Sequence, residues 1–113
     1  MKIIENSITL GDLKKMAREK FGNFVKAVTD VERQIVAVDA ELHADLEALL
    51  LENGSKQKDL WGINIYPELD GEDFLEFDSM INLRPSQGNR SRGVEDANIR
   101  ERIKTIVNKL VQK

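Results

Sequence analysis

Hydrophobic residues with helical spacing lie near both ends of the chain. Between Leu10 and Phe21 apolar residues recur every three or four positions, and between Val94 and Val111 they form a wider stripe of the same period. The first segment opens with Thr9-Leu10-Gly11-Asp12, which has the form of a capping box, and Gly22 is suited to end it. The pattern therefore predicts one amphipathic helix near each terminus.

The middle of the chain carries shorter apolar runs that are rich in valine and isoleucine. Such runs, bounded by polar breaks, are typical of strands. Phe24 to Val31 and Gln34 to Val38 are separated by two charged residues and predict a hairpin. Leu60 to Tyr66 and Phe74 to Leu83 predict two more strands, on either side of an acidic loop at Pro67 to Asp73.

The segment from Glu41 to Leu51 carries two periodicities at once. Its leucines share one face of a helix, but leucine and alanine also alternate with polar residues, and Asn53-Gly54 follows as a turn signal. The polar residues of this alternation are Glu41, His43, Asp45 and Glu47. We predict a strand here and keep a helix as the alternative.

Together these elements predict a single α+β domain over residues 1–113. The length suits one hydrophobic core and is too short for two. The expected architecture is an antiparallel sheet of about five strands, with the N-terminal and C-terminal helices packed on one face. That arrangement leaves the other face of the sheet to the polar side chains that alternate along the strands.

Composition narrows the classes of function. A net charge of −3 argues against extensive nucleic-acid binding, because that mode needs a basic surface. The absence of cysteine excludes disulfides and thiolate metal sites. The N-terminus lacks the apolar core of a signal peptide, and no run approaches the roughly 18 apolar residues of a membrane span. We therefore expect a cytoplasmic protein without membrane association, and no motif predicts a cofactor or a resident metal.

A donor-rich segment follows the last predicted strand. From Ser79 to Val94 there is no acidic residue, although aspartate and glutamate fill 20 of the 113 positions. Its arginines are planar donors suited to phosphate or carboxylate, but it matches no phosphate-loop motif. The candidate binding residues are Arg84, Ser86, Asn89, Arg90, Ser91 and Arg92. We predict that the loop from Arg84 to Gly93 contacts an anionic small molecule or an acidic or phosphorylated protein partner; pairing with the acidic run Glu68 to Asp78 is the alternative.

Two other hypotheses remain open from the sequence. On the strand interpretation, His43 and Asp45 project to one side of the sheet, and Asp78 on a later strand can join them. The protein would then be a small hydrolase with His43, Asp45 and Asp78 as its candidate catalytic residues. It would hydrolyse a phosphoester or use a metal ion in the reaction. If the segment from Glu41 to Leu51 is a helix instead, its polar side chains point in different directions around the helix axis and no longer share one face. The third hypothesis is a homodimerising interaction module that uses the exposed sheet face or its edge. The sequence does not decide whether the protein is an enzyme.

Three segments give the chain a family resemblance. They are Glu41 to Asp45, Leu60 to Asn64 and Ile81 to Asp96, the last of which contains the whole arginine-containing loop. Over essentially its full length the sequence resembles a family of short, uncharacterised prokaryotic proteins. The resemblance implies a single-domain prokaryotic protein. Because that family has no established activity, the resemblance assigns no catalytic residue.

Overall fold

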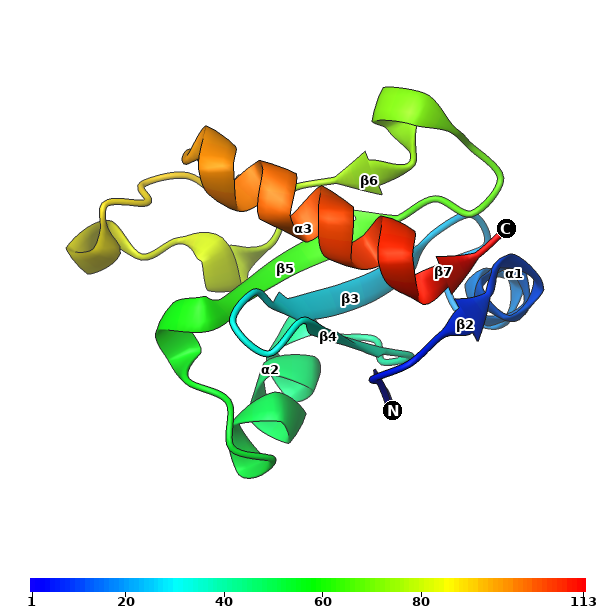
Figure 1. Cartoon of the computed structure of the whole chain (residues 1–113), viewed down its shortest axis with the longest axis horizontal. Helices are drawn as coiled ribbons and strands as arrows, with labels where there is room; N and C mark the ends of the chain where they lie inside the picture. Colours follow the sequence, from blue (N-terminus) through cyan, green and yellow to red (C-terminus); the bar gives the residue numbers. More distant parts are fainter.

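The computed structural model describes residues 1–113 and is built around a five-stranded antiparallel sheet (Figure 1). The strand order is β1-β4-β3-β5-β6. Its strands are β1 (Lys2–Ile4), β3 (Val25–Asp30), β4 (Ile35–Val38), β5 (Leu60–Ile65) and β6 (Leu75–Glu76). The helices are α1 (Leu10–Glu19), α2 (His43–Glu52) and α3 (Ala97–Leu110). A separate two-stranded parallel pair, β2 (Ile8–Thr9) and β7 (Val111–Gln112), joins the segment before α1 to the end of α3.

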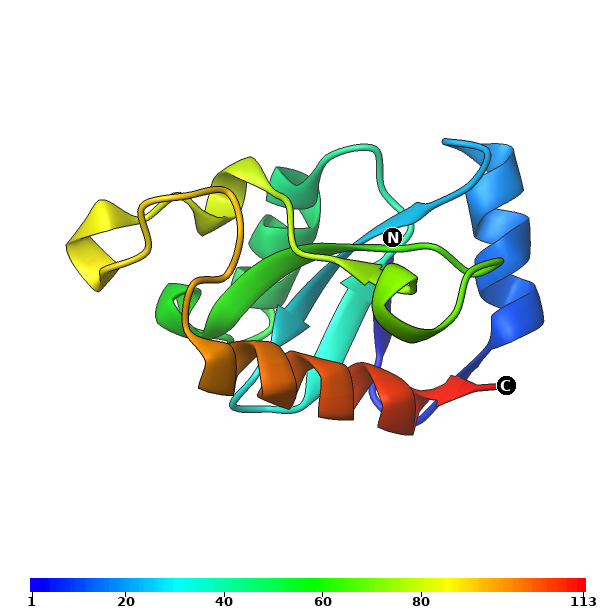
Figure 2. The same ribbon diagram turned by 90° about the horizontal axis from the view of Figure 1, so that it is seen from above.

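Helices cover both faces of the sheet. Helix α3 lies across one face and α2 packs on the other, while α1 stands at the end of the sheet near the C-terminus (Figure 1 and Figure 2). The larger core fills the space under α1 and α3, where Leu13, Ile103 and Val107 are buried with the strand residues Ala27 and Ile63. The predicted terminal helices and the hairpin of β3 and β4 are therefore confirmed. The Thr9 hydroxyl accepts a hydrogen bond from Asp12 N at 3.0 Å, which is the N-cap half of the predicted capping box.

The predicted strand from Glu41 to Leu51 is wrong, because this segment forms α2. Leu46 and Leu50 lie one turn apart and are fully buried. They pack with Val28, Ala37 and Leu60 in a second, smaller core. Strands β3, β4 and β5 are buried on nearly every residue of both faces, and Val28, Ala37 and Leu60 on the face turned away from α3 need their own helical cover.

The prediction of two helices on one face is therefore also wrong. There are three helices, and α2 covers the face that was expected to stay polar and exposed. The sheet has the expected five strands. The fifth is β1, which was not predicted, and not the segment that forms α2. The strand predicted from Phe74 to Leu83 shortens to the two residues of β6, followed by an irregular segment with a single 3-10 turn at Met80–Asn82.

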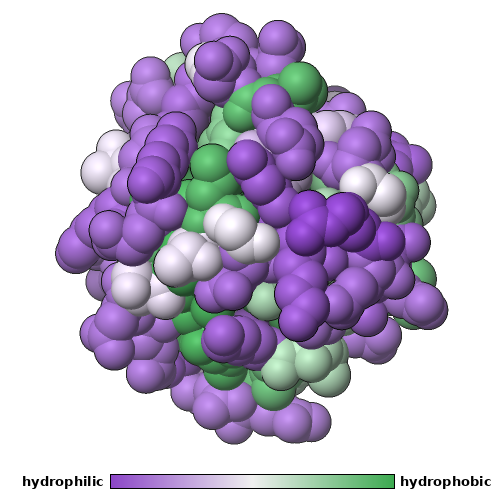
Figure 3. Space-filling view, turned by 90° about the vertical axis from the view of Figure 1, so that its right-hand side faces the viewer, coloured by the Kyte–Doolittle hydropathy of each residue, from purple (hydrophilic) through white to green (hydrophobic).

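The surface on the α1 side offers no broad apolar patch. Hydrophilic side chains dominate the space-filling view of this side, and apolar side chains show mainly as a narrow band between them (Figure 3). Interfaces between proteins are usually marked by wider contiguous apolar patches. The homodimer hypothesis relied on an exposed sheet face, which α2 covers, so it now depends on the sheet edges alone.

Candidate functional site

A cleft of about 380 Å³ opens on the α2 side of the sheet, and we call it the His43 cleft. It lies between the start of α2, strands β3 and β5, and the segment after β6. Its polar lining residues are Lys26, His43, Asn64, Glu76, Asp78, Ser79 and Arg92. Its apolar side chains come from Phe24, Leu42, Ala44, Met80 and Ile81. Residues that are far apart in the sequence therefore meet in one site.

Strand register builds the polar floor of this cleft. Lys26 on β3 pairs with Asn64 on β5, and Asn64 pairs in turn with Glu76 on β6. Directly paired residues of antiparallel strands point to the same face, so these three side chains form a row across the sheet. This row lies at the border of the apolar surface that α2 covers. It gives the cleft one cationic side chain, one amide and one carboxylate.

Asn64 holds an acceptor that nothing in the chain satisfies. Its Nδ2 donates to Glu76 Oε1 at 2.9 Å and to the Asp78 carbonyl at 3.3 Å. Both partners are acceptors, which fixes the orientation of the amide. The Oδ1 atom is then left buried without a hydrogen bond. Of the six buried side-chain atoms without a partner, it alone belongs to a residue of the cleft. Such an atom costs about 1 to 3 kcal/mol unless a donor reaches it.

His43 is the first residue of α2, and its ring is fixed by the strand beneath it. The ring Nε2 lies 2.8 Å from the Ile63 carbonyl oxygen. Because a carbonyl can only accept, Nε2 carries the hydrogen and the neutral ring presents Nδ1 as a free acceptor. Burial lowers the pKa of His43 below its ordinary value of 6.5, against the opposing effect of the Ile63 hydrogen bond. The ring is therefore a neutral base at physiological pH.

An ion pair borders the cleft beyond β6. Arg92 Nε donates to Asp78 Oδ1 at 2.7 Å, and both side chains are about half exposed, so the pair adds little to stability. The terminal nitrogens of Arg92 donate no hydrogen bond within the chain. Lys26 has no carboxylate partner, and its Nζ lies 5.0 Å from the centre of the Phe21 ring. The cleft thus has cationic groups with unused donors.

The structure divides the residues proposed for hydrolysis. His43 and Asp78 both line the cleft, but Asp45 lies on the exposed side of α2 and outside it. Helical geometry explains this, since residues two apart on a helix point in nearly opposite directions. No group of three or more histidine, cysteine, aspartate or glutamate side chains is placed to hold a metal ion. No helix combines the length and the apolar character needed to cross a membrane.

Several donors of the arginine-containing loop serve the fold itself. Arg84 donates to the backbone carbonyls of Gln57 and Leu60, and its guanidinium lies 4.2 Å from the centre of the Trp61 ring. Burial lowers the pKa of this arginine. Asn89 is buried, donates to the carbonyls of Asn82 and Gly93, and accepts from Glu95 N.

The other side chains of the loop make fewer hydrogen bonds within the chain. The Ser91 hydroxyl accepts from Gly93 N, whereas the side chains of Ser86 and Arg90 are exposed and make no hydrogen bond. Among the predicted loop residues, Arg92 alone lines the His43 cleft. Sequence reasoning does not point to Lys26, because only the strand register places it beside Asn64.

Comparison with known proteins identifies the family of the chain. No curated protein and no solved structure gives a significant match. A family model described as "Protein of unknown function (DUF5674)" matches residues 2–110, which is nearly the whole chain. The protein therefore belongs to this family of proteins of unknown function.

Proposed function

We propose that the protein binds a small organic anion in the His43 cleft, and that the ligand also carries a hydrogen-bond donor such as a hydroxyl or ammonium group. The observation that carries this proposal is the buried Oδ1 atom of Asn64, which has no partner in the chain. A donor on the ligand would satisfy that atom and recover the free energy that its burial costs.

The anionic part of the ligand follows from the groups at the mouth of the cleft. Arg92 has unused guanidinium nitrogens, and Lys26 is free of any carboxylate. Helix α2 starts at the same place, and Leu42 at its N-cap provides no side-chain hydrogen bond, so the first N–H groups of α2 favour negative charge. Glu76 and Asp78 already accept from Asn64 and Arg92, which reduces their repulsion of an anion.

The size of the cleft suits a metabolite. Its volume of about 380 Å³ lies within the range of small-molecule sites, which is roughly 300 to 1,000 Å³. The apolar rim, with Leu42 and Met80 largely exposed, can cover a short aliphatic part of the ligand. A hydroxy acid or an amino acid has the three required features, which are an acid group, a donor and a small carbon skeleton.

Nuclear magnetic resonance can test this proposal with a matched pair of arginine variants. ¹⁵N-labelled protein is titrated with malate, citrate, glutamate and inorganic phosphate, and the Asn64 side-chain amide is monitored. We expect an organic acid to shift this resonance and Arg92→Gln to weaken binding by about 10-fold or more, the scale of a hydrogen bond to a charged group. Arg90→Gln is the control, because Arg90 is exposed and lies outside the cleft.

Two results would count against the cleft. Equal weakening by Arg90→Gln and Arg92→Gln, with shifts confined to residues 84–93, would favour the loop predicted from the sequence. No shift at Asn64 with any member of the panel would leave the buried acceptor without the proposed role.

A hydrolase is the second candidate, and the fixed neutral ring of His43 favours it. His43 Nδ1 would take a proton from an attacking water, and Arg92 would stabilise the negative charge that develops on the substrate. Asp45 has no part in this version. The test is hydrolysis of p-nitrophenyl phosphate and p-nitrophenyl acetate. Activity that is lost in His43→Gln and retained in Asp45→Asn supports the hydrolase, and equal activity of His43→Gln and the unchanged protein refutes it.

A further inference from the structure

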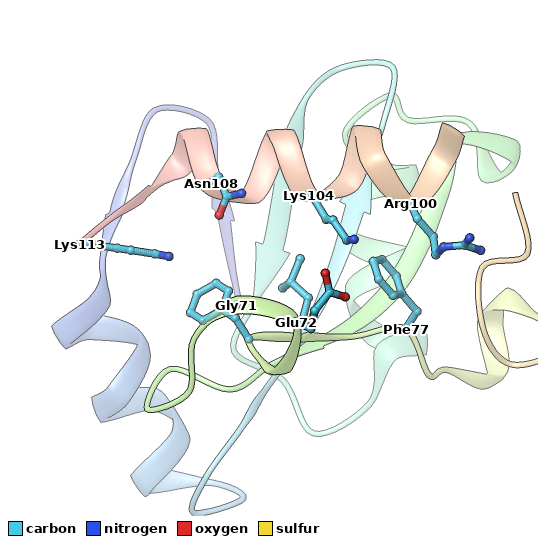
Figure 4. Close-up of a pocket in the computed structure, with 9 residues that line it drawn as sticks. Gly71, Glu72, Phe77, Arg100, Lys104, Asn108 and Lys113 are labelled. Atoms are coloured by element: carbon cyan, nitrogen blue, oxygen red, sulfur yellow. The ribbon is translucent and has the colours of Figure 1, made fainter. Parts of the chain in front are cut away.

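A second concave site lies on the other face of the sheet, between α3 and the chain around β6 (Figure 4). We call it the α3 groove. Its volume of about 390 Å³ is close to that of the His43 cleft. One wall is formed by Arg100, Lys104 and Asn108 of α3, and the opposite wall by Gly71 and Glu72, with Leu75 and two phenylalanines at its base and Lys113 at one end.

The groove is positively charged although the protein is acidic overall. Arg100, Lys104 and Lys113 line it together with one carboxylate, that of Glu72. The side chains of the lining therefore carry a net charge of +2, whereas the side chains of the whole chain carry −3. In Figure 4 the Glu72 carboxylate points toward Lys104, but the two make no ion pair. Local charge of this sign attracts an acidic ligand.

The three cations keep most of their bonding capacity. Lys113 Nζ lies 4.6 Å from the centre of the Phe74 ring and has no carboxylate partner. The one ion pair of Lys104 is an exposed contact of 3.8 Å with Glu101 in its own helix, which is worth little. Arg100 uses NH1 to donate to two backbone carbonyls, those of Val94 and Glu95, and its other nitrogens make no hydrogen bond.

The shape of the groove suits an extended chain. Arg100, Lys104 and Asn108 are spaced four residues apart and project from one side of α3, as Figure 4 shows. Eight residues of helix span about 12 Å, which is the length of roughly four residues of extended peptide. Lys113 lies beyond this row and prolongs the positive wall. A compact ion would reach only part of it.

Strand β6 offers hydrogen bonds beside the cationic wall. It is the last strand of the sheet, so one of its edges is free. Tyr66 N donates to the Phe74 carbonyl, and the hydrogen-bonding direction alternates along an antiparallel strand. The N–H and C=O of Leu75 therefore point away from β5, where an added strand could pair with them.

We propose that the α3 groove binds an extended acidic segment of a partner protein. Its backbone would run along the free edge of β6 at Leu75, and its carboxylates would face Arg100, Lys104 and Lys113. This site is separate from the His43 cleft, because Leu75 packs on the α3 side and Glu76 lies on the other. The two proposals can therefore fail independently.

The test uses fluorescein-labelled hexaglutamate and fluorescence anisotropy on the full chain. Lys104→Glu reverses a charge inside the groove, and Lys109→Glu makes the same change on the same helix at an exposed position outside it. We expect Lys104→Glu to weaken binding by about 10-fold or more and Lys109→Glu by less than about 3-fold, since a charge outside the contact acts only through screened long-range attraction. Lys104→Gln should weaken binding by an intermediate factor, and it keeps the test valid if Lys104→Glu fails to fold.

The same titration observed by amide resonances locates the peptide. Shifts at Leu75 and along residues 100–108 support the proposal. Equal losses in Lys104→Glu and Lys109→Glu would show attraction to net charge alone and overturn it. Displacement of the peptide by millimolar inorganic phosphate, at matched ionic strength, would make the groove a small-anion site and would also overturn it.

Discussion

Replacing Asn82 with alanine tests how the segment that carries Asp78 and Ser79 is held against the sheet. Asn82 is fully buried, and its amide bonds both backbone groups of Gly62. Oδ1 accepts from Gly62 N at 2.8 Å, and Nδ2 donates to the Gly62 carbonyl at 2.9 Å. Nδ2 also donates to the Arg92 carbonyl at 3.0 Å. The side chain therefore continues the hydrogen-bond ladder of β5 after β6 has ended.

The expected loss of stability follows from the two backbone groups of Gly62 that alanine would leave unpaired, since the Arg92 carbonyl still accepts from Ser79 N. Each buried group without a partner costs about 1 to 3 kcal/mol, with the N–H at the higher end. Allowing for water that reaches part of the vacated space, we expect Asn82→Ala to lower the free energy of unfolding by about 2 to 4 kcal/mol. That is a large fraction of the roughly 5 to 15 kcal/mol that stabilises a typical domain.

Urea unfolding measures this loss directly. Trp61 is the single tryptophan and is buried, so its fluorescence reports unfolding. The control is Asn98→Ala, an exposed asparagine in the first turn of α3 whose side chain makes no hydrogen bond, and it should change stability by less than about 0.5 kcal/mol. Asn82→Asp should destabilise as much as alanine at neutral pH, because it sets a carboxylate oxygen against two carbonyls. A loss below about 1 kcal/mol in Asn82→Ala would show that the amide does not hold the segment.

Two further predictions concern the core and the histidine. Ile103 is fully buried under α3, so Ile103→Ala should destabilise by about 2 to 4 kcal/mol in the same urea assay, and a change below about 0.5 kcal/mol would refute the packing of α3 on the sheet. Burial lowers the pKa of His43 below 6.5, so the unfolded chain binds a proton more readily, and stability should be full above about pH 6.5 and fall as the pH drops toward the folded-state pKa. Urea midpoints measured between about pH 7.5 and 5 should show this decline, and His43→Gln should flatten it; an unchanged decline in the variant would assign it to other groups.

Long periodic segments of this fold could be predicted from the sequence, and short elements could not. The stripe between Val94 and Val111 and the valine-rich hairpin each contain enough residues to show one period clearly. Strands β1 and β6 have three and two residues and carry no period at all. The sequence of α2 predicts a strand as readily as a helix because alanine falls between its leucines, so the same residues fit periods of 2 and 3.6. What decides between them is the second apolar face of the sheet, which is a property of the other strands.

The candidate site shows the same limit for polar residues. His43, Asp78 and Arg92 were selected by residue type, and the structure brings them to one cleft. Lys26 could not be selected, since its place beside Asn64 depends on the register of two strands that are far apart in sequence. A sequence also cannot show whether an asparagine or arginine donates to a ligand or to the protein backbone.

The amides and arginines after β6 acquire a common explanation from the shortness of that strand. With two residues in register, β6 cannot hold the following chain against β5 by backbone pairing alone. Asn82 supplies the missing pairing to Gly62, Asn89 closes the loop on itself, and Arg84 ties it to β5 through the Leu60 carbonyl. These side chains therefore supply hydrogen bonds that the backbone of a longer strand would otherwise provide. Arg92 remains at the end of this scaffold with unused donors, beside a buried acceptor on Asn64 and a fixed base on His43, and these three groups are the reason that we place the proposed ligand in the cleft.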